Sequence, residues 1–135
     1  MNKSAKKLLS ENDLGKTNSH QAGILIPKSL VAAGVFDSLS TTVKNPRVQL
    51  RCWDSSLETY FFPNYIFYNN KYFSGTRSEY RMTGLSAYFR ETGLRPGDLM
   101  IFTRTAKFEY TVDIERCNRK AAGLSEESWK QIYER

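Results

Sequence analysis

Alternation of hydrophobic and polar residues recurs along the chain and predicts β-strands. It is clearest over residues 108–114, where Phe, Tyr, Val and Ile alternate with Glu, Thr and Asp. The apolar-rich segment 98–104 precedes it across a three-residue connection, so the two segments are expected to pair as neighbouring strands.

Three further segments are β-prone. Residues 47–52 alternate between an apolar face and a face that carries two arginines, which predicts a half-exposed strand with a basic outer side. Residues 22–26 form a short apolar run. Residues 58–68 are rich in aromatic residues but contain Pro63, which must lie at an edge, at a bulge or at a break between two strands.

Short helices are predicted over residues 28–36, 85–92 and 124–133. Gly93 suits the left-handed position that closes the second helix, and Ser125 is a suitable N-cap for the third. The sum of six or seven short strands and two or three short helices predicts a mainly β fold, a small mixed barrel.

The composition indicates one domain with a polyanionic partner. The 135 residues contain no repeat, low-complexity block or linker, so a single domain over residues 1–135 is expected. The net charge is +6, and residues 1–106 hold all of the excess, with fourteen basic and eight acidic groups. Such an excess of positive charge favours a partner such as a nucleic acid.

Apolar runs in the chain are only a few residues long, against the roughly 20 that span a bilayer, and the basic amino terminus lacks the apolar stretch of a secretory signal. We therefore expect no membrane partner and a cytoplasmic location. Cys52 and Cys117 have no second Cys or His at ligand spacing, so two free, mostly buried thiols are expected.

The sequence offers no familiar catalytic or metal-binding motif, and we predict neither catalytic residues nor metal ligands. His20 is the only histidine, and phosphate-cradling loops, nucleophile elbows and the paired acidic and lysine residues of common nucleases are all missing from the sequence. A small enzyme centred on His20, with Asp13 and Ser19 or Glu79, stays open as an alternative.

Two polar segments beside β structure carry candidate chemistry. Residues 10–21 offer amide, hydroxyl, carboxylate and imidazole groups that can hydrogen-bond base edges or phosphates, although an ordinary solvated loop would have the same composition. In residues 71–81, Arg77, Glu79 and Arg81 alternate and would project from one face of an extended chain. Arginine can donate twice to guanine and a carboxylate can accept from cytosine, whereas a surface ion-pair ladder would need no ligand.

These segments carry a resemblance to a known family. The run Ser10-Glu11-Asn12-Asp13 through Gly15, Thr17 and His20-Gln21-x-Gly23 to Ile26-Pro27 resembles the amino-terminal effector-binding domain of the restriction endonuclease EcoRII. The run Tyr68-Asn69, Phe73, Thr76-Arg77-x-Glu79-x-Arg81 and Thr83 resembles it too, in the same order. The stretch from Tyr88-Phe89 through Thr92-Gly93-Leu94-Arg95-Pro96-Gly97-Asp98 to Phe102 is similar to plant B-three DNA-binding domains.

The resemblance covers about residues 8–115 and implies a seven-stranded open pseudobarrel with short helices, followed here by a helical tail over about 118–135. It implies two recognition arms that grip the major groove of double-stranded DNA and read a CCWGG-type site. We call residues 10–21 the first arm and residues 71–81 the second arm. The EcoRII pattern has lysines where this chain has Gly75 and Tyr80.

The DNA-binding residues predicted in this way lie in the two arms: Asn12, Asp13, Lys16, Thr17, Asn18, His20, Gln21, Lys71, Tyr72, Ser74, Thr76, Arg77, Ser78, Glu79, Tyr80 and Arg81. Candidate phosphate contacts are Lys28, Lys44, Arg47, Arg51 and Lys71.

The resulting hypothesis is a sequence-specific effector domain without catalytic activity of its own, forming the amino-terminal part of a longer type II restriction enzyme with a nuclease domain in the same chain. Binding is expected to need no cofactor, and magnesium would serve only the separate catalytic domain. The other open alternative is a single-stranded nucleic-acid-binding barrel, because a basic barrel with exposed aromatic residues can stack unpaired bases.

Overall fold

The computed structural model describes residues 3–15, 23–116 and 128–132. Within these residues it has ten strands, two α-helices and one 3-10 helix. Six strands form sheet A, in the spatial order β10 (Trp129–Ile132), β1 (Lys3–Leu8), β8 (Leu99–Ala106), β9 (Glu109–Glu115), β4 (Arg51–Asp54) and β5 (Thr59–Phe61). Four strands form sheet B, in the order β2 (Ile24–Ile26), β7 (Glu79–Thr83), β6 (Asn64–Tyr68) and β3 (Arg47–Gln49).

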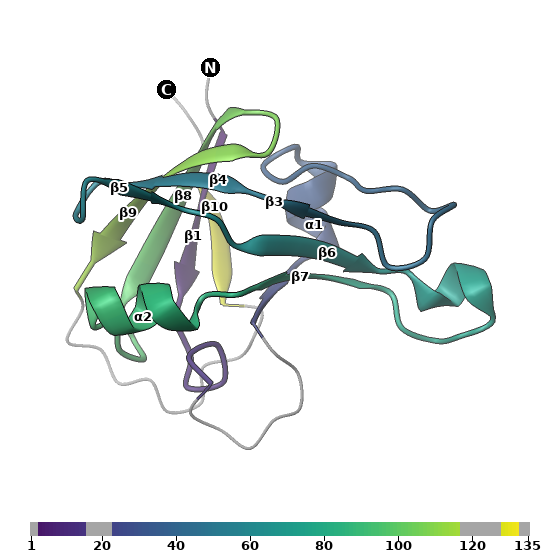
Figure 1. Cartoon of the computed structure of the whole chain (residues 1–135), viewed down its shortest axis with the longest axis horizontal. Coiled ribbons are helices and arrows are strands. Elements are labelled where there is room, and N and C mark those ends of the chain that lie inside the picture. Colours follow the sequence, from purple (N-terminus) through teal and green to yellow (C-terminus); the bar gives the residue numbers. More distant parts are fainter. Residues whose placement is uncertain (1–2, 16–22, 117–127, 133–135) are drawn as a thin grey trace.

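Strands β6 and β7 of sheet B lie across β1, β8 and β10 of sheet A (Figure 1). Hydrophobic side chains from both sheets form the core. On one side the chain itself joins the sheets, because β3 continues through Leu50 into β4 and β5 continues through Pro63 into β6. The Leu50 amide donates to the Pro63 carbonyl at 2.9 Å, so the two points at which the chain passes from one sheet to the other lie side by side. The alternating segment 47–52 and the break at Pro63 are thus confirmed, and each connects two sheets.

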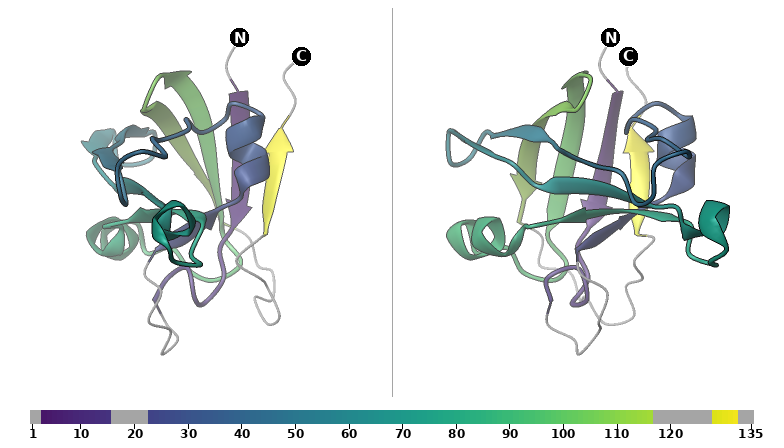
Figure 2. Two further views of the ribbon diagram at one scale, coloured as in Figure 1. Left: turned by 90° about the vertical axis from the view of Figure 1, so that its right-hand side faces the viewer. Right: turned by 45° about the vertical axis from the view of Figure 1, so that its right-hand side comes forward.

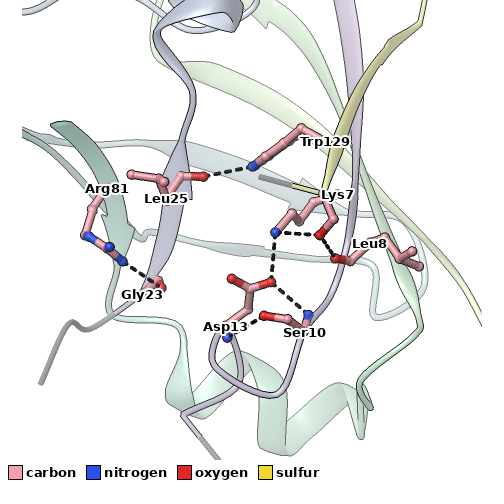
Figure 3. Close-up of polar contacts among 9 residues, drawn as sticks. Lys7, Leu8, Ser10, Asp13, Gly23, Leu25, Arg81 and Trp129 are labelled. Atoms are coloured by element: carbon pink, nitrogen blue, oxygen red, sulfur yellow. Dashed lines mark hydrogen bonds and ion pairs between the residues drawn. The ribbon is translucent and has the colours of Figure 1, made fainter. Parts of the chain in front are cut away.

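A side chain joins the other two sheet edges, β2 and β10. Trp129 Nε1 donates to the carbonyl oxygen of Leu25 at 2.8 Å (Figure 3). The prediction of a helix over 124–133 is wrong for residues 129–132, which pair antiparallel with β1 from Lys7↔Trp129 to Ser4↔Ile132. The physical reason is that the Trp129 ring packs in the core, 5.6 Å from the Phe36 ring. The barrel therefore extends beyond residues 8–115 at both ends.

The mainly β class is confirmed, although the described residues form ten short strands rather than seven. The predicted pairing of 98–104 with 108–114 is the antiparallel pair β8 and β9. The first two predicted helices are α1 (Lys28–Ala32) and α2 (Ser86–Thr92), and Gly93 closes α2 with a φ of 67°. Figure 2 shows α1 beside the sheets and α2 at the opposite end of the barrel from the 3-10 helix η1 (Asn70–Phe73).

Aromatic side chains dominate the core. Phe36, just after α1, is almost fully buried and lies within 6 Å, centroid to centroid, of the rings of Tyr65, Phe102, Tyr110 and Trp129. Two of these tyrosines also satisfy the backbone beside Phe36: Tyr110 donates to the Val35 carbonyl at 2.8 Å and Tyr65 donates to the Asp37 carbonyl at 2.7 Å. The segment between α1 and β3 is therefore fastened directly to the core.

Cys52 is a free, buried thiol, as expected, and burial raises its pKa to about 12. It stays protonated at neutral pH and is not a nucleophile. Cys117 lies outside the described residues. In the part of the chain that is described, no helix combines the length and the apolar character needed to cross a membrane.

Asp54 fastens helix α2 to strand β4. Its Oδ1 accepts hydrogen bonds from the Ser56 amide, the Ser56 hydroxyl and the Leu57 amide, and its Oδ2 accepts one from the Tyr88 hydroxyl. Burial by itself would raise the pKa of Asp54, but the hydrogen bonds from Ser56, Tyr88 and Leu57 outweigh it, so the pKa lies below the ordinary value of an aspartate. The charged form is the one that the fold stabilises.

We expect Asp54→Asn to lower the free energy of unfolding at pH 7 by about 1.5–3 kcal/mol, because hydrogen bonds to a charged acceptor are lost. A carboxylate with a depressed folded-state pKa stabilises the fold above its unfolded pKa, and this contribution disappears as the pH falls through the folded value. Urea unfolding of both proteins at pH 7 and at successive values below about pH 4 measures this. A difference that does not shrink with acidification would contradict it.

Candidate nucleic-acid interface

The first arm begins as a buried turn. Ser10 and Asp13 exchange hydrogen bonds, from the Ser10 amide to Asp13 Oδ2 at 2.8 Å and from the Asp13 amide to Ser10 Oγ at 3.2 Å. Asp13 Oδ2 also lies 3.0 Å from Lys7 Nζ, and both side chains have no exposed area (Figure 3). Lys7 Nζ donates further to Ser128 Oγ at 2.9 Å. The turn is thereby fixed to β1 and to the residue before β10.

Asp13, a predicted base contact, is therefore directed into the protein and not toward solvent. Asn12 is half-buried. The other predicted residues of this arm lie outside the described residues: Lys16, Thr17, Asn18, His20 and Gln21.

The second arm projects beyond both sheets at one end of the molecule (Figure 1). It runs from η1 through the loop 74–78 into the first residues of β7, and so follows β6 in the chain. Backbone hydrogen bonds close it, from the Lys71 amide to the Arg77 carbonyl at 3.0 Å and from the Gly75 amide to the Asn70 carbonyl at 2.8 Å. Seven predicted residues of this arm are exposed or half-buried: Lys71, Tyr72, Ser74, Thr76, Arg77, Ser78 and Glu79.

Asn69 anchors the base of the second arm. Its side chain is fully buried; Nδ2 donates to the carbonyls of Ser40 (3.0 Å) and Val43 (2.7 Å), and Oδ1 accepts from the Asn45 amide (2.8 Å). On the other side of the arm, Lys28 Nζ donates to Ser78 Oγ at 2.6 Å. The arm is therefore braced by the 40–45 loop and by the first residue of α1.

Arg77 is held from two sides. Its Nε lies 2.5 Å from Glu79 Oε1, and its guanidinium carbon lies 3.7 Å from the centroid of the Tyr68 ring, a cation–π contact. Glu79 Oε2 lies 3.2 Å from Arg81 Nε. The three alternating charges predicted from sequence thus come together as one ion-pair ladder, in which the Arg77 side chain is 36% exposed and that of Arg81 only 1%.

Tyr80 lies in the core and does not project with Arg77. Its ring stacks on Phe67 at 4.2 Å, and its hydroxyl accepts a hydrogen bond from the Leu39 amide at 3.1 Å. Alternation along β7 explains this position, because Tyr80 and Met82 share the inward face of the strand. A lysine at this position would place its charge toward the core.

Gly75 has a local packing reason. A Cβ at this position would lie 2.8 Å from Asn70 Cβ, closer than real contacts of this kind. A lysine therefore could not replace Gly75 without a shift of η1, whose first residue is Asn70.

Of the other basic candidates, Lys44, Arg47 and Lys71 are exposed. Arg51 is paired with Glu109 at 3.0 Å and lies over the Tyr60 ring, on the β4–β5 side of the barrel. Among the described residues no three His, Cys, Asp or Glu side chains are grouped so that they could hold a metal ion.

Three residues that organise this surface were given no role from sequence: Tyr68, Asn69 and Gly23. Tyr68 and Asn69 stand next to each other directly before η1, and their place in the family resemblance was the available signal. Gly23 follows the first arm, and its φ of +79° brings its backbone against β7, where a Cβ would lie 2.0 Å from the Met82 carbonyl oxygen.

Solved structures with a similar fold match most or all of this chain. An Arabidopsis FUS3–DNA complex superimposes with a TM-score of 0.62 at 17% identity, over 84% of this chain and 96% of that one. The B3 domain of the UbaLAI restriction endonuclease, with cognate DNA, gives 0.55 at 19% identity over 84% and 67%. The N-terminal domain of Helicobacter pylori LlaJI.R1 gives 0.58 at 12% identity over the full length of both chains. At these identities the likeness concerns the fold.

Sequence comparison identifies the family. The type II restriction enzyme EcoRII of Escherichia coli is 37% identical over 94 residues, which cover 62% of this chain and 22% of that enzyme. The chain thus matches about a fifth of the length of this relative. A family model described as restriction endonuclease EcoRII, N-terminal, matches residues 3–128. The chain therefore belongs to the family of EcoRII N-terminal domains.

Proposed function

We propose that this domain binds double-stranded DNA in a sequence-specific manner, with the second arm in the major groove. The observation that carries this proposal is Arg77, an arginine held in place at the surface of a projecting arm. A fixed guanidinium can donate two hydrogen bonds to guanine O6 and N7, the commonest specific contact to a base. The net charge of +6 supplies the attraction to phosphates.

Family membership supports the same role. Two structures with this fold are complexes with DNA, one of them a restriction endonuclease domain with its cognate site. We infer that the domain serves as the effector and target-recognition part of a type II restriction endonuclease, that its site is of the CCWGG type, and that cleavage belongs to a nuclease domain elsewhere in the full-length chain. Binding by this domain needs no divalent metal, and its place of action is the cytoplasm.

A binding titration tests the proposal. A CCWGG duplex, a scrambled duplex and a single strand are compared at two salt concentrations without magnesium. Tight and selective binding to the intact site is expected, weakening with salt because phosphate contacts release counterions. Equal binding to the two duplexes would overturn sequence-specific recognition.

The single strand is included for a specific reason. Tyr72 at 60% and Phe73 at 40% exposure lie on the second arm, and unpaired bases stack on such rings. Preference for the single strand would favour this second function. Arg77, on the same arm, can donate to a guanine edge in the major groove, which favours the duplex.

Arg77→Ala is expected to reduce discrimination at one G·C base pair by about 1–3 kcal/mol, because the two-point contact to guanine is lost. Titration against single-base-pair variants of the site measures this. Arg90→Ala is the matched control, since it removes an exposed arginine on α2, at the end of the molecule away from the second arm (Figure 1). Equal losses on cognate and random duplexes for Arg77→Ala would contradict a base-reading role.

A further inference from the structure

The guanidinium of Arg81 contacts the residue Gly23, which lies just after the first arm, and Glu79 of the second arm. Its Nη1 lies 3.5 Å from the carbonyl oxygen of Gly23, which follows the first arm (Figure 3). Its Nε lies 3.2 Å from Glu79 Oε2 in the second arm. Because the Arg81 side chain is only 1% exposed, it is placed between these groups and not at a surface that DNA could reach.

The Gly23 end of this connection is fixed by backbone packing. Gly23 has a φ of +79°, and its α-carbon lies so close to β7 that a Cβ would overlap the Met82 carbonyl. The next residue pairs with β7 in the register Ile24↔Met82. The carbonyl that accepts from Arg81 therefore belongs to a constrained segment.

Glu79 links Arg81 to Arg77. One carboxylate oxygen of Glu79 binds Arg81 and the other binds Arg77, whose guanidinium also lies on the Tyr68 ring. Among the described residues, Nη1 and Nη2 of Arg77 make no hydrogen bond, which leaves both as donors for a base edge. Losing the Arg81 contact would free Glu79 to rotate, and Arg77 with it.

We propose that Arg81 is a positioning residue and not a DNA contact: it joins the end of the first arm to Glu79 and thereby holds Arg77 in its reading orientation. This proposal rests on the proposed function, because the orientation matters only if Arg77 reads a base. Glu79 has the intermediate role in the same chain of contacts. Lysine cannot replace Arg81 here, because its single ammonium lacks the planar fork of donors that reaches both partners.

The test combines Arg81→Lys, Arg77→Ala and the double variant. Each is titrated against the CCWGG duplex and against duplexes with one substituted base pair. Arg81→Lys is expected to lose discrimination at the same base pair as Arg77→Ala, within the about 5- to 150-fold that one bidentate contact supplies. The double variant is expected to be no worse there than Arg77→Ala, because both changes remove one interaction.

A purely structural role for Arg81 would weaken all duplexes by the same factor, and a direct base contact would add its own loss in the double variant. Either result overturns the proposal. Arg90→Lys, on α2, is the control for an arginine-to-lysine change away from the arms. The slope of log K against log salt is expected to stay unchanged in Arg81→Lys, since neither residue at this position touches phosphate.

A measurement on the free protein keeps the proposal testable if Arg81→Lys fails to fold. The Nε–H group of Arg77 is expected to be rigid in the wild type and mobile in Glu79→Gln, by side-chain ¹⁵N relaxation. Equal mobility in the two proteins overturns the proposal. This readout needs no DNA, so it separates the two failures: a wild type that does not select CCWGG refutes the proposed function, whereas unchanged Arg77 mobility refutes the positioning role.

Discussion

Asp13→Ala is expected to lower the free energy of unfolding by about 3–5 kcal/mol, the usual cost of leaving one member of a buried ion pair without its partner. Lys7 and Asp13 have no exposed side-chain area, and their charged atoms lie 3.0 Å apart. Removal of the carboxylate leaves the Lys7 ammonium in the interior without this counter-charge, while its hydrogen bond to the Ser128 hydroxyl remains. It also removes the acceptor of the Ser10 amide, so the turn that begins the first arm loses its closure.

Urea unfolding measures this effect, and two variants act as controls. Lys6→Met removes a neighbouring lysine that is only half-buried and should change stability by less than about 0.5 kcal/mol. The double variant Lys7→Met/Asp13→Leu should recover the part of the loss that comes from the buried charge, because apolar residues can replace a buried ion pair at little cost, but not the part that comes from the Ser10 amide. Asp13 Oδ1 is buried with no hydrogen-bond partner among the described residues, so replacing this oxygen by an apolar group breaks no hydrogen bond. A loss below about 1 kcal/mol for Asp13→Ala would contradict the buried pair.

The second large effect is expected for Phe36→Ala, which should cost about 3–5 kcal/mol of unfolding free energy. The Phe36 ring is 1% exposed and lies between aromatic residues of both sheets, including Tyr65 of β6 and Tyr110 of β9. Its truncation leaves a cavity that rigid rings cannot fill. It also removes the edge-to-face partner of Trp129, so hydrogen exchange in β10 should accelerate more than exchange in β9.

Phe62→Ala is the matched control for this change. Phe62 is 54% exposed beside β5, and its truncation should change stability by less than about 1 kcal/mol. Similar losses for the two variants would mean that Phe36 does not fill the centre of the core. Circular dichroism in the near ultraviolet, before unfolding, checks that Phe36→Ala retains native packing.

Elements with a local signal were predictable from sequence. The alternation over 108–114 became β9, Pro63 marked the change of sheet, and Gly93 closed α2. Each of these depends on residues within a few positions of each other, which is the range that hydrophobic periodicity and turn chemistry report.

Strands β1 and β10 were not predictable in the same way. Strand β1 reads Lys-Ser-Ala-Lys-Lys-Leu, and its inward face includes Lys7, whose burial depends on Asp13. β10 exists through its pairing with β1, more than 120 residues away along the chain. The N-cap candidate Ser125 indicated a helix here, because a local signal of this kind contains nothing about a distant partner strand.

The sequence predicted which charged residues of the candidate site lie together, but not which of them are buried. The spacing of Arg77, Glu79 and Arg81 correctly predicted a common face, and the ladder alternative considered from sequence is present. That Arg81 would be covered depends on Gly23, a contact between residues 58 positions apart. Whether the predicted arm residues contact bases stays a prediction for the titrations above.

The pairing of β1 with β10 places the start of the described fold beside its end. Ser4 lies opposite Ile132 in antiparallel register. A short linker between these strands would turn the chain into a ring, and the exposed turn 55–58 between β4 and β5, at the end of the molecule opposite the second arm, is a site at which the ring could be reopened (Figure 1). Such a circular permutant would keep both arms uncut. Its new termini would lie far from the second arm, and a reporter or a foreign domain could be attached to them.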